Sequence, residues 1–164
     1  MLQNGIVWIS RETLSQIEAE AERLFPVETG GVLIGYWVKP FKEVVITHAT
    51  GPGTKAVHKS HSFLPDSEFQ EAEIKRHYQD SGRIHTYLGD WHSHGAGDVY
   101  LSRIDKKTLR KIAEHEEART PIPLMAVLGE GHNWVLKVWR YKMPRFGKFS
   151  FGIKVLPLKP VIYT

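Results

Sequence analysis

Residues 88–105 read Leu-Gly-Asp-Trp-His-Ser-His-Gly-Ala-Gly-Asp-Val-Tyr-Leu-Ser-Arg-Ile-Asp, a pattern that predicts a strand, a glycine-containing loop and the start of a helix. His92 and His94 stand two positions apart, and alternate side chains of a strand point to the same face, so both imidazoles can converge on one point. Asp105 follows, with Ser102 three residues before it. Two imidazoles and one carboxylate leave a fourth position open for water. This is the ligand count of a catalytic zinc site rather than a structural one.

Each half of this pattern also has an ordinary structural interpretation. A His-x-His pair is common on strands, and Ser102-x-x-Asp105 is a capping box at the start of a helix. Asp105 could also simply lie near the positive end of that helix. The spacing of the two halves together is more specific than either half alone.

The composition is that of a globular chain that forms one domain. The chain has 164 residues, which is enough to bury a sizeable core. No apolar run approaches the ~18 residues that span a membrane, and no signal peptide is visible at the start, so we expect no membrane association and a cytoplasmic protein. There is no cysteine, which excludes disulfides, cysteine nucleophiles and thiolate zinc sites. Any metal must be held by nitrogen and oxygen.

The charge balance is basic but not extreme. The net charge is +4, with some density of Lys and Arg in residues 137–159. A nucleic-acid binder usually gathers its cations on one stripe, whereas most of these are spread along the chain, so no nucleic-acid partner is expected. The denser segment fits a solvated strand face or a docking surface for an acidic or nucleotide-bearing partner.

Strand and helix patterns alternate along the chain and predict an α/β domain, with a central mixed sheet packed by about three helices. The expected helices cover about 11–24, 67–81 and 102–117, and Ser67-x-x-Gln70 fits a capping box at the second. Residues 123–128 are continuously apolar, as in a strand that is buried on both faces. Glu28 falls in the turn before a strand at 31–38, where a glutamate is usually exposed.

Two segments are harder to interpret. Residues 56–63 are expected to form one strand, in which His58 and His61 face opposite sides and so are not joint ligands; both read as surface or substrate-side residues. Residues 142–164 alternate enough for one more strand. The closing stretch, which contains Pro157 and Pro160, could form an arm on the same domain or on a partner.

The pattern His92-x-His94-x7-Ser102-x2-Asp105 resembles the JAMM motif of the JAB/MPN metalloprotease family. The family also carries an upstream glutamate, which Glu28 supplies here. The likeness to bacterial stand-alone members runs from about residue 16 to residue 138. Gly95 is a departure, because many relatives have proline at that position.

This resemblance implies a JAB/MPN fold, which is cytidine-deaminase-like, over residues 1–141. We expect residues 142–164 to form a C-terminal strand or arm packed on the same domain. The resemblance also implies a Zn²⁺ cofactor held by His92, His94 and Asp105. Glu28 would be the general base, and Ser102 would bind the oxyanion. The implied activity is that of a zinc-dependent, deubiquitinase-like isopeptidase or peptidase. Its substrate would be a protein with an extended C-terminal tail, either ubiquitin-like or conjugated by E1- and E2-like enzymes.

Two alternatives belong to other functional classes. A non-catalytic MPN interaction module is one, although such modules typically lack motif residues that this chain keeps. A non-haem iron oxygenase is the other, because two histidines and one carboxylate also form an iron triad. That alternative gives no role to Glu28 or Ser102.

Overall fold

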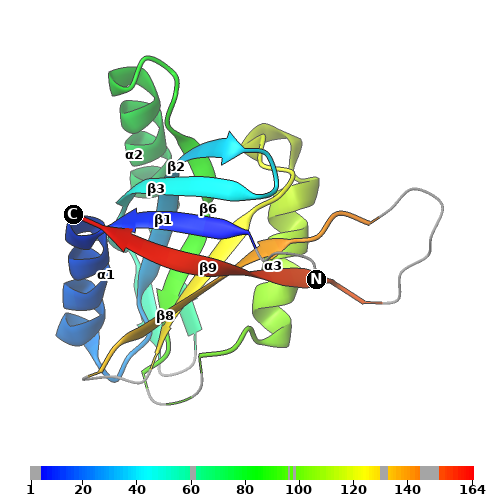
Figure 1. The fold of residues 1–164 in the computed structure, drawn as a ribbon. Helices are drawn as coiled ribbons and strands as arrows, with labels where there is room; N and C mark the ends of the chain where they lie inside the picture. Colours follow the sequence, from blue (N-terminus) through cyan, green and yellow to red (C-terminus); the bar gives the residue numbers. More distant parts are fainter. Residues whose placement is uncertain (1–4, 60–61, 96, 98, 130–132, 145–151) are drawn as a thin grey trace.

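The computed structural model describes residues 5–59, 62–95, 97, 99–129, 133–144 and 152–164. They form one α/β domain of nine strands and three α-helices within the described residues, and Figure 1 shows their arrangement. In chain order the elements are β1 Ile6–Ser10, α1 Arg11–Leu24, β2 Gly30–Lys39, β3 Glu43–Ala49, β4 Val57–Lys59, β5 Ser62–Leu64, α2 Ser67–Asp80, β6 Thr86–Ser93, α3 Arg103–Glu114, a 3-10 turn Glu116–Ala118, β7 Leu124–Gly129, β8 Val135–Tyr141 and β9 Val155–Tyr163.

Seven of the strands form a mixed sheet that closes on itself. Its order is β1-β3-β2-β6-β7-β8-β9, and β9 returns to pair with β1 in parallel and with β8 in antiparallel register. In Figure 1, β9 (red) runs beside β1 (blue). The segment containing Pro157 and Pro160, read from the sequence as a possible arm, is therefore a strand of this sheet, while residues 145–151 lie outside the described residues.

Two hydrophobic cores lie on the two faces of the sheet. Leu14, Ile17 and Ala21 of α1 belong to the larger core, and Leu109 of α3 belongs to the smaller one. Strand β7 is buried along its whole length because its alternate residues enter both cores. The continuous apolar run therefore gave a correct prediction of a strand that is buried on both faces. In Figure 1 the helices α1 and α3 are well separated, with strands between them.

The N-cap of helix α2 lies one residue before Ser67, the N-cap that the expected capping box predicts. Asp66 is the N-cap, and its carboxylate accepts a hydrogen bond from Phe69 N at 3.3 Å. Gln70 is not a capping residue: its amide donates to the carbonyls of Gly51 and Pro52, at 2.8 and 3.2 Å, and the Thr50 hydroxyl donates to its oxygen. The prediction was wrong because the buried Gln70 amide donates its hydrogen bonds to carbonyls of a loop rather than capping its own helix. The loop at 50–55 is thereby fixed to α2.

The expected single strand at 56–63 is instead a hairpin. Strands β4 and β5 pair in antiparallel register, with His58 opposite Phe63 and Val57 opposite Leu64. The two residues between the strands, one of which is His61, lie outside the described residues. The sequence carries no glycine, asparagine or proline at that turn, so the pattern gave no sign of a reversal. None of the described helices is long and apolar enough to cross a membrane.

Candidate metal centre

Strand β6 carries His92 at the middle of the sheet and leads directly to His94. It lies between β2 and β7, where Gly30 pairs opposite His92 on one side and Val127 on the other. His94 follows the end of the strand, and its N–H still donates to the Leu128 carbonyl at 2.8 Å. The backbone of His92 is therefore fixed from both sides of the strand, and that of His94 from the β7 side.

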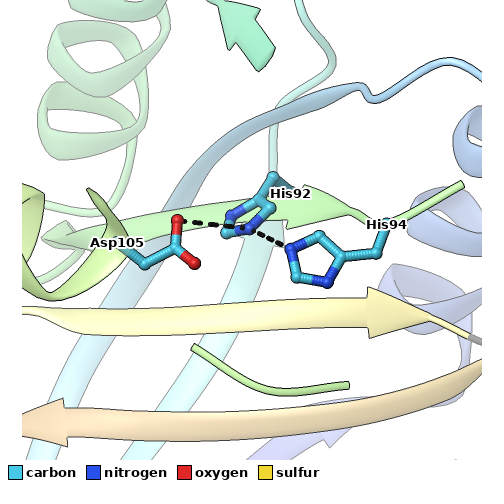
Figure 2. Close-up of side chains that lie close together, drawn as sticks. All are labelled: His92, His94 and Asp105. Atoms are coloured by element: carbon cyan, nitrogen blue, oxygen red, sulfur yellow. Dashed lines mark hydrogen bonds and ion pairs between the residues drawn. The ribbon is translucent and has the colours of Figure 1, made fainter. Parts of the chain in front are cut away.

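The side chains of His92, His94 and Asp105 converge, as Figure 2 shows. His92 Nε2 lies 3.0 Å from His94 Nε2 and 3.5 Å from an Asp105 oxygen. One ligand atom from each residue can be chosen so that all three lie within 4.8 Å of one another. Ligands bound tetrahedrally to zinc at ~2.0–2.2 Å stand about 3.3–3.6 Å apart. The two separations from His92 Nε2, 3.0 and 3.5 Å, are thus close to the spacing that a tetrahedral metal site requires.

Asp105 performs a structural and an electrostatic function with different oxygens. One oxygen accepts a hydrogen bond from Ser102 N at 2.7 Å, and the Ser102 hydroxyl accepts one from Asp105 N at 3.1 Å. This is the capping box expected from the sequence, and it starts α3. The other oxygen faces His92. The ordinary interpretation of Ser102-x-x-Asp105 and the metal interpretation therefore describe the same geometry.

The environment of His92 favours the neutral imidazole. Its side chain is 13% exposed, and burial lowers its pKa below the ordinary value, with a further lowering by His94 and an opposing effect from Asp105. A neutral ring has a free lone pair, which is the form that binds a metal. The Ser102 hydroxyl is exposed at the edge of the cluster and retains a proton to donate, since its oxygen acts as the acceptor in the cap.

Glu28 lies in the segment between α1 and β2, two residues before the Gly30 that pairs with His92. The Thr29 carbonyl accepts a hydrogen bond from Ser93 N at 2.8 Å. The backbone that leads from the upstream glutamate, which only the family resemblance assigned to the site, is therefore bound to the strand end that precedes His94.

Two glycines allow the chain to pack closely around the cluster. A Cβ built on Gly30 would overlap the Trp91 carbonyl and come within 3.0 Å of the Phe63 ring. A Cβ on Gly95 would overlap the carbonyl of Pro26. Gly95 thus has a physical reason in this chain, because the backbone directly after His94 lies against Pro26, in the segment before Glu28.

Comparison with known proteins agrees with this geometry. The family model described as prokaryotic homologs of the JAB domain matches residues 10–142. A probable metalloprotease, y4qB, from Sinorhizobium fredii is 38% identical over 142 residues, which is 85% of this chain and 86% of that protein. A CD-NTase/cGAS isopeptidase from Enterobacter hormaechei is 27% identical over 124 residues, covering 74% of this chain and 66% of that protein.

The fold has a counterpart among solved structures. The solution structure of protein DSY2949 from Desulfitobacterium hafniense superposes with a TM-score of 0.68, covering 96% of this chain and 93% of that one at 18% identity. At this identity the likeness concerns the fold alone. The family match and the more similar relative together give the chain a peptidase-type hydrolase function. The chain belongs to the prokaryotic JAB-domain family.

Proposed function

We propose that the protein is a zinc-dependent isopeptidase or peptidase that hydrolyses the bond after the C-terminus of a ubiquitin-like or otherwise conjugated protein. The observation that carries the proposal is the convergence of His92, His94 and Asp105. The segment that carries Glu28 is bound to the same strand through Thr29 and Gly30, which supports a function for this glutamate at the site. The isopeptidase name of one relative supports the substrate class.

His92, His94 and Asp105 would hold the metal. When bound, zinc supplies a Lewis acid that brings the pKa of a water ligand near 7 and polarises a carbonyl. Glu28 accepts a proton from the attacking water and passes it to the departing nitrogen, so that the C–N bond breaks to give a carboxylate and an amine. The Ser102 hydroxyl donates a hydrogen bond to the oxygen that becomes negative during attack.

An extended substrate tail needs a place to dock near the cluster. The seven-stranded sheet closes between β9 and β1, so among the described strands the free edges belong to the β4–β5 hairpin. Phe63 of this hairpin lies against Gly30, which stands opposite His92. We therefore place the tail along a hairpin edge, where main-chain hydrogen bonds would supply affinity that depends little on sequence.

Cleavage of defined fusions tests the proposal. Two probes suit it: ubiquitin joined through its C-terminus to a reporter protein, and a CD-NTase joined in the same way. Zinc-loaded wild-type protein should cut at least one probe at the junction, and chelation should abolish cleavage until zinc is returned.

Glu28→Gln is the matched variant, because it preserves side-chain shape but removes the base. It should retain one zinc per chain while losing roughly 10²–10⁴-fold in kcat. Wild-type rates in Glu28→Gln would contradict the assignment of the base. Cleavage that persists after complete metal removal would contradict the metal dependence.

A further inference from the structure

The β4–β5 hairpin has one face turned toward the molecule and one turned to solvent. His58 and Phe63 form a cross-strand pair on the inward face, with ring centroids 5.3 Å apart. Val57 and Leu64 form the outward pair and are 47% and 64% exposed. A two-stranded hairpin is marginally stable alone, so its position depends on what its inward pair contacts.

The inward pair contacts the segment that carries Glu28. His58 Nδ1 lies 2.9 Å from the Glu28 carbonyl oxygen. A carbonyl oxygen only accepts, so the imidazole carries its proton on Nδ1 and donates it. Two residues on, the Phe63 ring covers Gly30, where a side chain would come within 3.0 Å of it. The hairpin thus contacts both ends of the segment 28–30, which runs from the candidate base Glu28 to Gly30, the residue that pairs with His92.

The other end of the hairpin is fixed independently. Asp66 accepts a hydrogen bond from Lys55 N at 3.1 Å, and its own N–H donates to the Pro52 carbonyl at 3.0 Å. Gln70 binds the carbonyls of the same loop. Helix α2 therefore sets the direction in which the hairpin leaves the domain, and the contact of His58 transmits that position to the backbone at residue 28.

We infer that His58 is a positioning residue: with Phe63 it holds the hairpin on residues 28–30 and so fixes where the Glu28 carboxylate stands. This rests on the proposed function of Glu28 as the base. The sequence offered no sign of it: His58 was expected on a single strand, as a surface or substrate-side residue, and its contact with the Glu28 carbonyl joins residues 30 positions apart in the chain.

Three variants separate the hydrogen bond from the shape of the ring. His58→Leu removes the donor. His58→Asn restores an N–H near the position of Nδ1. Lys59→Leu makes an apolar change on the exposed, outward side of the same strand. Because the hairpin lies outside the seven-stranded sheet, all three should unfold at the wild-type temperature.

Hydrogen exchange measured by mass spectrometry reads the docking without any substrate. Peptides covering residues 26–32 and 55–64 should exchange faster in His58→Leu, and should match the wild type in His58→Asn and Lys59→Leu. Faster exchange in the hairpin alone, or equal exchange in all four proteins, overturns the inference.

Cleavage kinetics on the ubiquitin or CD-NTase fusion test whether His58 positions the Glu28 carboxylate. His58→Leu should lower kcat roughly 10- to 100-fold with little change in KM, and His58→Asn should recover most of it. A raised KM at unchanged kcat overturns the positioning role in favour of substrate binding. If the wild type cuts neither fusion, the proposed function fails and the assignment to Glu28 falls with it, while the exchange result still decides whether His58 docks the hairpin.

Discussion

The Asp105 side chain caps α3 with one oxygen and faces His92 with the other, and substitutions can separate these two functions. Asp105→Asn keeps an oxygen for the cap but loses the charge that a cation needs, so zinc affinity should fall at least tenfold with metal-free stability almost unchanged. Asp105→Ala should lose zinc and also about 0.5–1.5 kcal/mol of folding free energy. Isothermal titration calorimetry measures the zinc affinity, and urea unfolding of the metal-free proteins measures the folding free energy. Equal zinc affinity in Asp105→Asn and wild type would exclude Asp105 as a ligand.

Ser102 combines a cap with a proposed catalytic donor. Its hydroxyl oxygen accepts from Asp105 N, and losing an N-cap serine costs about 0.5–2 kcal/mol when alanine replaces it but only a few tenths when glycine does. Ser102→Ala and Ser102→Gly should therefore differ in stability but share a roughly 10²–10³-fold loss of kcat on the fusion probe. If kcat falls in Ser102→Ala but stays near the wild-type value in the more stable Ser102→Gly, Ser102 is only a helix cap and not a catalytic donor.

How far these residues could be predicted depends on their separation in the chain. His92, His94, Ser102 and Asp105 lie within one strand–loop–helix unit, so their spacing alone indicates that they can meet. The segment of Glu28 approaches β6 only through the β2–β6 register, which no local pattern encodes, and the family resemblance supplied this residue. His58 was missed because its contact with the Glu28 carbonyl joins residues 30 positions apart in the chain.

At the scale of elements, α2 contacts the sheet through a group of histidines. The ring of His77 lies 3.9 Å from that of His48 on β3, centroid to centroid, and His48 lies 5.6 Å from His85. Burial lowers the pKa of His48, and the charges of His77, His85 and Arg76 add to this while Glu12 opposes it. Burial and Arg76 likewise lower the pKa of His77, against Glu73 and Asp80. The rings of His48 and His77 are therefore packed where a positive charge on either ring is disfavoured.

This arrangement predicts that acid loosens the fold. A histidine whose folded pKa lies below its unfolded value binds more protons when unfolded, so the stability is fully present above about pH 6.5 and is lost as the pH falls below it. Urea midpoints of the metal-free protein should drop from pH 7.5 to pH 5.5. The drop should be smaller in His77→Gln, whose amide cannot take up a proton. An identical pH dependence in that variant would contradict the account.

Element types were easier to predict than their connections. Helix α1 occupies the expected residues because Ser10 caps it and Pro26 follows its end. Helix α3 ends at Glu114, earlier than expected, and a separate 3-10 turn follows. Prolines are rare in strands that pair on both sides, yet Pro157 and Pro160 lie in β9, which does so.

For the whole molecule, a bound metal would join two elements that follow one another in the chain, β6 and α3. His92 belongs to β6 and Asp105 to α3, so an ion bound between them ties that helix to the sheet. Zinc at 100 times its Kd should stabilise the fold by about 2.7 kcal/mol, or roughly 5–11 °C in Tm. Thermal unfolding with zinc and with chelator measures this, with Asp105→Ala as the control that should not respond. Equal Tm values in the wild type under both conditions would count against the site.

Closure of the sheet was beyond the reach of sequence patterns. Alternation indicates that a strand exists, but the pairing of β9 with β1 joins opposite ends of the chain and depends on the twist accumulated over all seven strands. The α/β class and the mixed sheet were predicted from alternation and helix periodicity, and both are confirmed.

Elemental analysis of the purified protein beside His94→Ala tests the central claim most directly. The geometry predicts one zinc per wild-type chain and almost none in the variant, whose fold should otherwise persist. Iron in place of zinc would favour an oxygenase with the same three ligands. An absence of metal from the wild type after zinc loading would contradict the metal centre and leave the protein without its proposed chemistry.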